Sequence, residues 1–463
     1  MLYAEILWTL AQIFMKNKKT DVVIIGGGTA GISSAQYIAE RGGRACLIER
    51  ATLGGRSVKT GLQGRRFLEE ALKEGFSIKS EFHKIIEYCQ SRMAELSAEL
   101  ESQLKSIGVE VLYGEGAPRG SRSVQVDGKG ESFSIETGKI IIATGSRPDS
   151  GIHLPLDGQA ILSPQDFWDA KPATAPSSVM ITGSEEPSFE AARFFKSLGA
   201  KVFWVNQTKR LLPEAHESLS SKLEEIAKKE KIKVLPGKKL ISHLKNDDNI
   251  DVSLEGGVKF STEKIFIVEG RKPETKGLNL EGMGMRLGVS GETLTEENLE
   301  TSVPGIFSAG SVLGRESVFG LSEEEGRVAA ENAMGEKRNM SSDMTPRIIH
   351  SKPEMAWIGI SADLAHHHGL RAIEGKAVDF GINHANGEFC KIVCDKESQR
   401  IIGAQLVTDH ASELIHLISL CIRRGLKPQS LAKMNCFRSS SANGLRLAAL
   451  ECVKQLKKTS KKD

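Results

Sequence analysis

The 463-residue sequence has no Cys-x-x-Cys pair, few aromatic residues and no large excess of charge of either sign. Its seven cysteines are scattered along the chain, which argues against a disulfide framework and suits a reducing cytoplasm. Aromatic residues make up only 5% of the chain, which argues against a surface that stacks nucleic-acid bases. The 62 basic and 59 acidic residues leave a net charge of +3, too small to attract nucleic acid. We therefore expect no nucleic-acid partner.

No stretch of the sequence approaches the roughly 18 apolar residues that a transmembrane helix needs. Residues 1–15 place apolar side chains on one face of a predicted helix, but they have no leading basic region and no small-residue cleavage site, so we predict no signal peptide. Three interpretations stay open for this segment. It is an extension upstream of a natural start at Met15, a helix packed on the fold, or a weak membrane-surface anchor.

Residues 20–50 have the pattern of a dinucleotide-binding βαβ unit. A buried-strand run leads into Gly26, Gly28 and Gly31, spaced as GxGxxG, and a helical stretch and a second strand ending at Glu49 follow. Gly26 lets the chain turn out of the strand, Gly28 lets the backbone approach a pyrophosphate, and Gly31 lets the helix pack closely. The helix N-terminus offers free N–H groups to phosphates. Glu49, about 20 residues on, can accept hydrogen bonds from a ribose hydroxyl.

Further motifs follow along the rest of the chain. An LGG sequence comes soon after Glu49, residues 140–148 read IIIATGSRP, residues 301–307 read TSVPGIF, residues 325–332 read EGRVAAEN and residues 353–359 read PEMAWIG. In this order, over about residues 20–455, the motifs resemble those of the FAD-dependent pyridine nucleotide–disulfide oxidoreductases. That family includes dihydrolipoamide dehydrogenase, glutathione reductase and mercuric reductase.

The resemblance implies an α/β fold with two Rossmann-like dinucleotide-binding domains, of FAD and NAD(P)H type, and a C-terminal α+β dimerisation domain. The implied parts are an N-terminal extension (1–19), the first part of the FAD-binding domain (20–150), the NAD(P)H-type domain (151–272), a return segment of the FAD domain (273–340), the dimerisation domain (345–455) and a basic tail (456–463). It also implies a cytoplasmic homodimer formed through the C-terminal domain.

The resemblance implies FAD as the cofactor and assigns its contacts to glycines, the ribose acid and turn residues. The assigned residues are Gly26, Gly28, Gly31, Glu49, Gly54, Gly55, Thr144, Gly145, Gly310 and Ser311. Ser311 stands where the family has an aspartate that binds the ribityl chain of the flavin. Because serine is shorter and uncharged, we expect FAD affinity to weaken by about 1–2 kcal/mol and not to vanish.

Arg66 and Glu190 stand where the family has a lysine–glutamate pair near the flavin. We predict an Arg66–Glu190 pair that keeps a positive charge beside the flavin, although the planar guanidinium differs from an ammonium in geometry. The alternative is a surface arginine.

The family passes electrons from NAD(P)H through the flavin to a cysteine pair, and a His–Glu pair of the other subunit handles protons. Ser57 and Leu62 stand at the cysteine positions, and neither can form a disulfide. Phe437 and Ala442 stand at the histidine and glutamate positions, and neither can transfer a proton. We therefore assign no catalytic residue and do not expect ordinary disulfide reductase activity.

The second nucleotide-binding loop departs from the family's GxGxxGxE pattern, because it reads GSEEPSFE from Gly183 to Glu190. Glu185 replaces the glycine at which the backbone approaches the pyrophosphate. A carboxylate about 4 Å from a phosphate charge costs on the order of 4 kcal/mol at an effective dielectric constant of about 20. Ser188 replaces the packing glycine, a milder change. We therefore expect the βαβ fold to survive and tight NAD(P)H binding to be lost.

A metal site is not predicted. His366, His367 and His368 are consecutive in a helix end, so their side chains point in different directions and do not converge on one ion.

Two functions of different classes stay open. The first is an FAD-binding flavoprotein with the dithiol relay lost and at most slow electron transfer from the flavin to small acceptors such as quinones or oxygen. The second is a catalytically silent pseudoenzyme that acts by binding, for example by pairing with an active relative through the shared interface.

Overall fold

The structure is a computed structural model that describes residues 20–59, 62–128, 132–149, 154–213, 215–315, 319–341, 345–378, 380 and 387–459. The N-terminal segment 1–15, for which three interpretations are open, lies outside the described residues, as does the end of the basic tail. The chain divides into two compact units. The first comprises Met1–Pro176 and Lys264–Met340, and the second comprises Ser177–Glu263 and Ser341–Asp463.

A seven-stranded sheet forms the centre of the first unit, in the order β3-β2-β1-β6-β5-β4 with β17 beside β6. The strands are β1 (Thr20–Ile25), β2 (Ala45–Glu49), β3 (Glu110–Tyr113), β4 (Glu115–Pro118), β5 (Ser123–Asp127), β6 (Ser132–Ile142) and β17 (Ile306–Ser308). β1 pairs in parallel with both β2 and β6, and its residues 22–25 are at most 3% exposed. Burial on both faces explains why this strand is a continuous run of valine and isoleucine.

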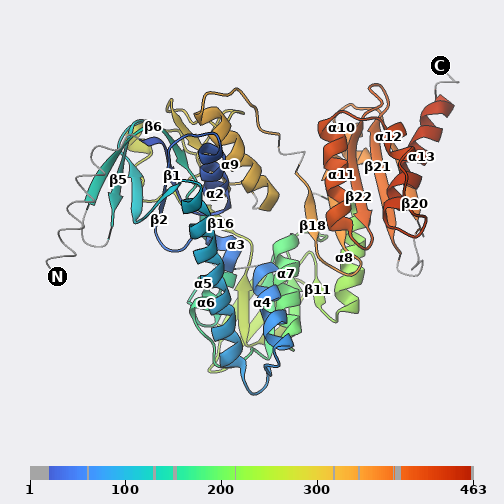
Figure 1. Cartoon of the computed structure of the whole chain (residues 1–463). Coiled ribbons are helices and arrows are strands. Elements are labelled where there is room, and N and C mark those ends of the chain that lie inside the picture. Colours follow the sequence, from blue (N-terminus) through green and yellow to red (C-terminus); the bar gives the residue numbers. More distant parts are fainter. Residues whose placement is uncertain are drawn as a thin grey trace. The chain divides into compact units, whose positions relative to one another are not determined.

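Helices α2 (Thr29–Glu40) and α9 (Phe319–Ala333) lie side by side, although about 290 residues separate them in sequence (Figure 1). Glycine allows this close packing, because a Cβ on Gly326 would lie 2.2 Å from the carbonyl oxygen of Ala30. The other helices of the unit are α3 (Gly55–Lys59), α4 (Leu62–Lys73), α5 (Phe82–Ser106) and α6 (Pro164–Asp169).

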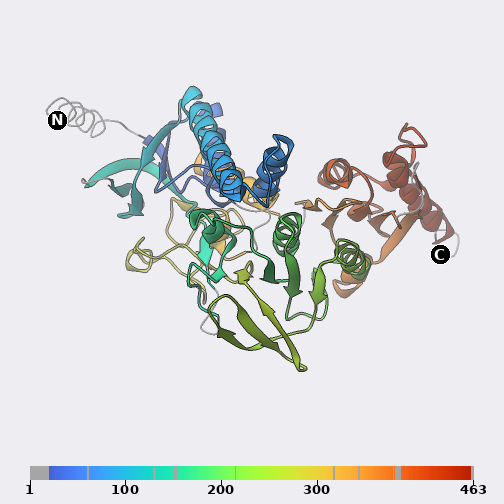
Figure 2. The same ribbon diagram turned by 90° about the horizontal axis from the view of Figure 1, so that it is seen from below.

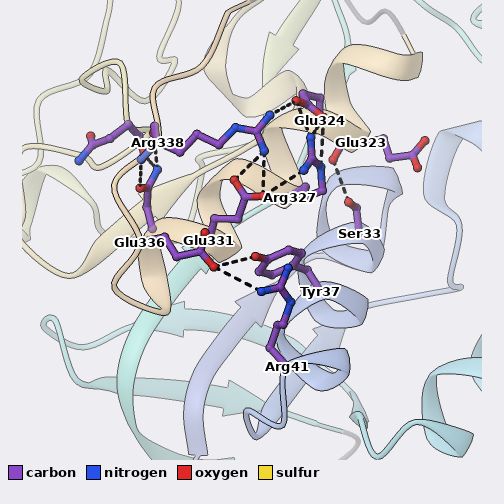
Figure 3. Close-up of polar contacts among 11 residues, drawn as sticks. Ser33, Tyr37, Arg41, Glu323, Glu324, Arg327, Glu331, Glu336 and Arg338 are labelled. Carbon is purple, nitrogen blue, oxygen red and sulfur yellow. Dashed lines mark hydrogen bonds and ion pairs between the residues drawn. The ribbon is translucent and has the colours of Figure 1, made fainter. Parts of the chain in front are cut away.

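A network of paired charges links α9 to the segment that follows it (Figure 3). Glu324 and Glu331 each pair with both Arg327 and Arg338, at 2.6–3.0 Å. The arginines are about one-third exposed, so each pair is worth little by itself. A separate contact joins that segment to α2, because the hydroxyl of Tyr37 donates to the carboxylate of Glu336 at 2.8 Å.

Two small strand pairs complete the first unit. β7 (Ser146–Pro148) pairs with β16 (Arg271–Pro273) in antiparallel register, and β8 (Ile161–Leu162) pairs in parallel with β15 (Lys264–Ile267). The first of these pairs brings residues 271–274 to the turn after β6, which matters for the site described below.

The second unit begins with the βαβ arrangement that the sequence predicts. β9 (Ser178–Thr182), β10 (Lys201–Val205) and β11 (Lys233–Leu235) are parallel, with α7 (Glu186–Ser197) after β9 and α8 (Glu217–Lys229) after β10. Three antiparallel strands follow, β12 (Leu240–Lys245), β13 (Ile250–Leu254) and β14 (Val258–Thr262), drawn in yellow-green in Figure 2.

A five-stranded antiparallel sheet in the order β18-β19-β22-β21-β20 makes up the C-terminal part of the second unit. Its strands are β18 (Arg347–Ile349), β19 (Met355–Gly359), β20 (Ala372–Val378), β21 (Phe389–Asp395) and β22 (Ile401–Val407), and its helices are α10 (Ala362–His367), α11 (Ala411–Arg423), α12 (Pro428–Ala432) and α13 (Ala442–Thr459). Four cysteines contribute to its core, and all seven cysteines of the chain are free thiols.

His366, His367 and His368 are exposed at the end of α10. Within the described ranges, no group of three His, Cys, Asp or Glu side chains could bind a metal ion. In the same part of the chain, no helix has both the length and the apolar composition that crossing a membrane requires.

Candidate functional site

A cavity of about 420 Å³ lies in the first unit at the carboxyl ends of β1, β2 and β6. This edge of a parallel sheet is where α/β proteins bind their ligands. The structure brings most of the predicted cofactor residues together in the lining: Gly26, Gly28, Glu49, Gly54, Gly55, Thr144, Gly145, Gly310 and Ser311. Gly31 lies directly behind this lining, against Gly26.

The glycines after β1 form a cradle for a ligand. A Cβ on Gly26 would lie 2.3 Å from the carbonyl oxygen of Ala143, and a Cβ on Gly31 would lie 1.8 Å from that of Gly26, so both positions require glycine. Gly28 differs, because a Cβ there would meet no atom within 4 Å and would project into open space. Gly28 is the N-cap of α2, and no side chain accepts a hydrogen bond from the first N–H groups of the helix. These N–H groups can therefore donate to a ligand in the cavity.

Glu49 lines the cavity and also braces the glycine loop. One oxygen of its buried carboxylate accepts the N–H of Gly27 at 2.7 Å, and the other accepts the N–H of Ala51 at 2.8 Å. A Cβ on Gly27 would lie 2.5 Å from a methyl group of Leu53, so a larger residue there would force the Leu53 side chain to shift. The GxGxxG spacing did not single out Gly27. In the sequence, Gly27 is distinguished only by its position between Gly26 and Gly28.

The return segment closes one side of the cavity. The hydroxyl of Thr144 donates to the carbonyl oxygen of Glu274 at 2.7 Å, and the N–H of Glu274 donates to the carbonyl oxygen of Gly145 at 2.9 Å. The carboxylate of Glu274 lies 3.4 Å from the guanidinium of Arg50, and both residues line the cavity. Sequence reasoning missed Glu274, because only the β7–β16 pairing brings it to this turn.

Gly310 and Ser311 enter the lining from the end of β17. Gly310 has a φ of +82°, and its N–H donates to the carboxylate of Glu325 on α9 at 2.9 Å. Burial raises the pKa of Glu325 to about 7, against the lowering effect of Arg315 at 3.3 Å. The carboxyl group of Glu325 therefore supports the backbone at Gly310, the residue before Ser311. The EGRVAAEN sequence by itself does not predict this role.

Ser57, which stands where the family has the first of its two cysteines, lies in the cavity lining. Its hydroxyl donates to the carbonyl oxygen of Gly54 at 2.5 Å and accepts from the hydroxyl of Thr29 at 3.3 Å. Among the described residues that line the cavity there is no cysteine. The side chain of Leu62, the second such position, lies outside the described side chains.

Arg56, next to Ser57 in sequence, interacts electrostatically with Arg271. Arg56 lines the cavity, and burial lowers the pKa of its guanidinium. The pKa of Arg271 falls to about 9, first because of burial and second because of the charge of Arg56. Arg271 is oriented by Ser146, whose hydroxyl and carbonyl oxygens accept hydrogen bonds at 2.9 and 2.5 Å. Two close guanidinium groups favour an anionic ligand. Sequence reasoning missed both residues.

Arg66 and Glu190, predicted to pair, lie in different units, so their pairing stays a prediction. The side chain of Arg66 is 68% exposed and pairs with Glu70 at 3.3 Å, which fits the alternative of a surface arginine. Glu190 is buried on α7.

The residues that replace the NAD(P)H-loop glycine and the proton-transferring His–Glu pair of the family are in the second unit. Glu185 is the N-cap of α7, is buried and pairs with Arg347 at 2.8 Å. Phe437 is 84% exposed, and Ala442 is the first residue of α13.

Comparisons of the sequence identify relatives over nearly its whole length. The sequence model for pyridine nucleotide-disulphide oxidoreductases matches residues 20–336, and that for the dimerisation domain of these proteins matches residues 345–447. Dihydrolipoyl dehydrogenase of Vibrio parahaemolyticus is 28% identical over 443 residues, which cover 90% of this chain and 92% of that protein. Mercuric reductase of Staphylococcus aureus is 26% identical over 474 residues, which cover 96% of this chain and 85% of that protein.

Solved structures show the same fold. LpdA of Mycobacterium tuberculosis superimposes with a TM-score of 0.82 at 22% identity, over 93% of this chain and 99% of that one. The HOCl-induced flavoprotein disulfide reductase RclA of Escherichia coli gives a TM-score of 0.79 at 21% identity, again over 93% and 99%. The predicted α/β fold is thus confirmed. Since the family's sequence model alone covers residues 20–336, the chain belongs to the pyridine nucleotide-disulphide oxidoreductases, a family of FAD-dependent proteins.

Proposed function

We propose that this protein is an FAD-binding flavoprotein that has lost the dithiol relay of its family and exchanges electrons only at the flavin. The observation that carries the proposal is the glycine-lined cavity of the first unit, which has Ser57 and no described cysteine in its lining. The flavin, when bound, would supply electron transfer to a small acceptor such as a quinone or oxygen.

The residues present fit FAD. The open position at Gly28 and the uncapped start of α2 leave space and N–H donors for a pyrophosphate, and Glu49 offers a carboxylate for a ribose. Arg56 also lines the cavity, and its guanidinium adds a positive charge that would attract the pyrophosphate.

The loss of the relay is supported by how Ser57 is used. Its hydroxyl is engaged with Gly54 and Thr29, so it is a structural hydrogen-bonding group within the cavity wall. A hydroxyl cannot form the mixed disulfide that thiol exchange needs. The exposed Phe437 likewise has no group that can transfer a proton.

The protein would work as a cytoplasmic homodimer. The match of residues 345–447 to the family's dimerisation domain supports dimer formation, and the scattered free thiols support a reducing compartment.

A visible absorbance spectrum of the purified protein tests the cofactor. We expect flavin bands, and we expect Gly28→Glu to abolish them because it places a carboxylate where the phosphates would bind. Gln36→Glu, which adds the same charge further along α2, serves as the control and should keep the bands. A colourless protein that FAD cannot reconstitute would contradict the proposal and favour the silent, partner-binding alternative.

Anaerobic addition of a dithiol substrate tests the loss of the relay. Dihydrolipoamide should leave the flavin oxidised, whereas a small chemical reductant such as dithionite should bleach it. Turnover with a dithiol at rates similar to those of the relatives would show that the relay works in another way.

A further inference from the structure

An ion triad occupies the second nucleotide-binding loop. It consists of Glu185, Glu186 and Arg347, where Glu185 and Glu186 begin α7 and Arg347 begins β18. The guanidinium donates to Glu185 at 2.8 Å and to both oxygens of Glu186 at 2.6 and 2.7 Å. The side chains of the two glutamates are only 8% and 13% exposed. Such forked, partly buried hydrogen bonds between opposite charges are among the stronger polar contacts in proteins.

Arg347 is itself fixed in place. Its guanidinium carbon lies 5.3 Å from the ring centre of Trp357, its register partner on β19, and its side chain is 17% exposed. An arginine stacked on an aromatic ring and forked between two carboxylates has little freedom to leave.

The rest of the loop is closed by contacts from other elements. The indole N–H of Trp204 on β10 donates to the carbonyl oxygen of Gly183 at 2.7 Å, and the N–H of Leu212 donates to that of Ser184 at 2.8 Å. The hydroxyl of Ser188 donates back to the carbonyl oxygen of Thr182 at 3.2 Å. The loop therefore has a defined conformation that does not need a ligand.

The two nucleotide-binding loops of the chain are thus in opposite states. After β1, the second motif glycine, Gly28, faces open space. After β9, the matching position is Glu185, whose carboxylate is buried against Arg347. The same strand–turn–helix plan presents an open cradle in one unit and a filled one in the other.

We infer that Arg347 is a specificity-determining residue: it holds Glu185 and Glu186 where the phosphates of a dinucleotide would lie, so that the second nucleotide-binding domain excludes NAD(P)H. The inference concerns the second unit alone and does not depend on FAD in the first.

Rotation of Glu185 away from the loop would not open the site. Glu186 would still present a carboxylate there, and the partly buried guanidinium would lose one of its two partners. A dinucleotide brings two phosphate charges, so it would have to overcome two carboxylates as well as the loss of the paired charges.

Further contacts join the same two parts of the second unit. Arg193 on α7 donates to the carbonyl oxygen of His350, and the ring of His216 lies 3.3 Å from the carboxylate of Asp363. Several contacts therefore join the nucleotide-type βαβ segment to the C-terminal part of the unit. Among them, the ion triad lies at the loop where a dinucleotide phosphate would bind.

NADH fluorescence titration of the full-length protein tests the inference. We expect the unmodified protein to show no saturation at millimolar NADH. In the variant Glu185→Gly/Glu186→Ala the two carboxylates are gone and the guanidinium of Arg347 remains as a positive charge beside the loop, so affinity should rise by at least about tenfold. Adding Arg347→Gln to this variant should reverse most of the gain, because the guanidinium is then missing.

Arg338→Gln is the matched control. Added to the double variant, it breaks an arginine–glutamate network in the first unit and should leave the gain in NADH affinity unchanged. Saturation of the unmodified protein at micromolar NADH would overturn the inference. A double variant with native circular dichroism but no gain in NADH affinity would overturn it as well, because the triad would then not be what excludes the nucleotide.

Discussion

At the scale of single residues, buried carboxyl groups shape the loops of the first unit. Glu49 accepts the N–H of Gly27 and Glu325 accepts the N–H of Gly310, so these carboxyl groups support the loop conformation from behind. The side chain of Glu325 is almost fully buried, and this burial raises its pKa against the lowering effect of Arg315.

The pKa of Glu325 predicts a pH-dependent stability. In the folded protein the pKa is about 7, above the ordinary value of 4.5, so the folded state binds the proton more tightly than the unfolded chain. This contribution is complete below about pH 4.5 and is lost as the pH rises through about 7. Between about pH 5 and pH 8 we expect it to fall by about 2 kcal/mol.

Urea unfolding of the unmodified protein and of Glu325→Gln at both pH values measures this effect. The glutamine keeps an acceptor for the N–H of Gly310 but does not titrate, so the free energy of unfolding should depend less on pH in the variant. Equal pH dependence in the two proteins would show that Glu325 does not titrate in this range.

At the scale of elements, the packing of α2 against α9 positions the cavity. α2 carries the glycine loop at its start, and α9 carries Glu325 behind Gly310, so the distance between the helices determines how the two sides of the cavity meet. Gly326 permits the closest approach, and the hydroxyl of Ser33 on α2 donates to the carbonyl oxygen of Glu323 on α9 (Figure 3).

Gly326→Ala should therefore destabilise the protein, although alanine is the better helix former by about 1 kcal/mol. The new Cβ would lie 2.2 Å from the carbonyl oxygen of Ala30, and the shift of the helices should cost on the order of 1–3 kcal/mol. Chemical unfolding measures the change. Glu323→Ala, at an exposed position of α9, is the control and should stay within about 0.5 kcal/mol of the unmodified protein. A stabilising Gly326→Ala would show that the helices separate at little cost.

At the scale of the whole molecule, exposed apolar side chains accompany the dimerisation match. Phe437 is 84% exposed and Leu420 is 53% exposed, and both lie in the region that matches the family's dimerisation domain. Large exposed apolar groups of this kind are typical of surfaces that a partner covers.

We expect a mass of about twice the 50.3 kDa chain in light scattering. Phe437→Ser should shift the protein towards monomer, because burial of a phenylalanine contributes about 2–3 kcal/mol for each copy. Val289→Ser removes a fully exposed apolar side chain from the first unit and should leave the mass unchanged. A monomeric unmodified protein would contradict the proposed homodimer.

The sequence by itself determined the family, the α/β fold and the open cradle after β1. These follow from local patterns, because a buried strand, three spaced glycines and an amphipathic helix lie within about 20 consecutive residues. Each of the three glycines has one structural role in such a unit. From its charge alone, Glu185 was also predicted to repel a phosphate at the second loop.

Only the tertiary structure decided what surrounds these patterns. Arg347 is 162 positions from Glu185, Glu325 acts on a glycine 15 positions away, and Arg271 reaches Arg56 through the β7–β16 pairing. Periodicity and spacing carry no record of such contacts, because they depend on how separate elements pack. The sequence therefore showed which nucleotide-binding loop departs from the family's pattern. Only the packing of β18 against that loop showed that Arg347 pairs with both of its glutamates.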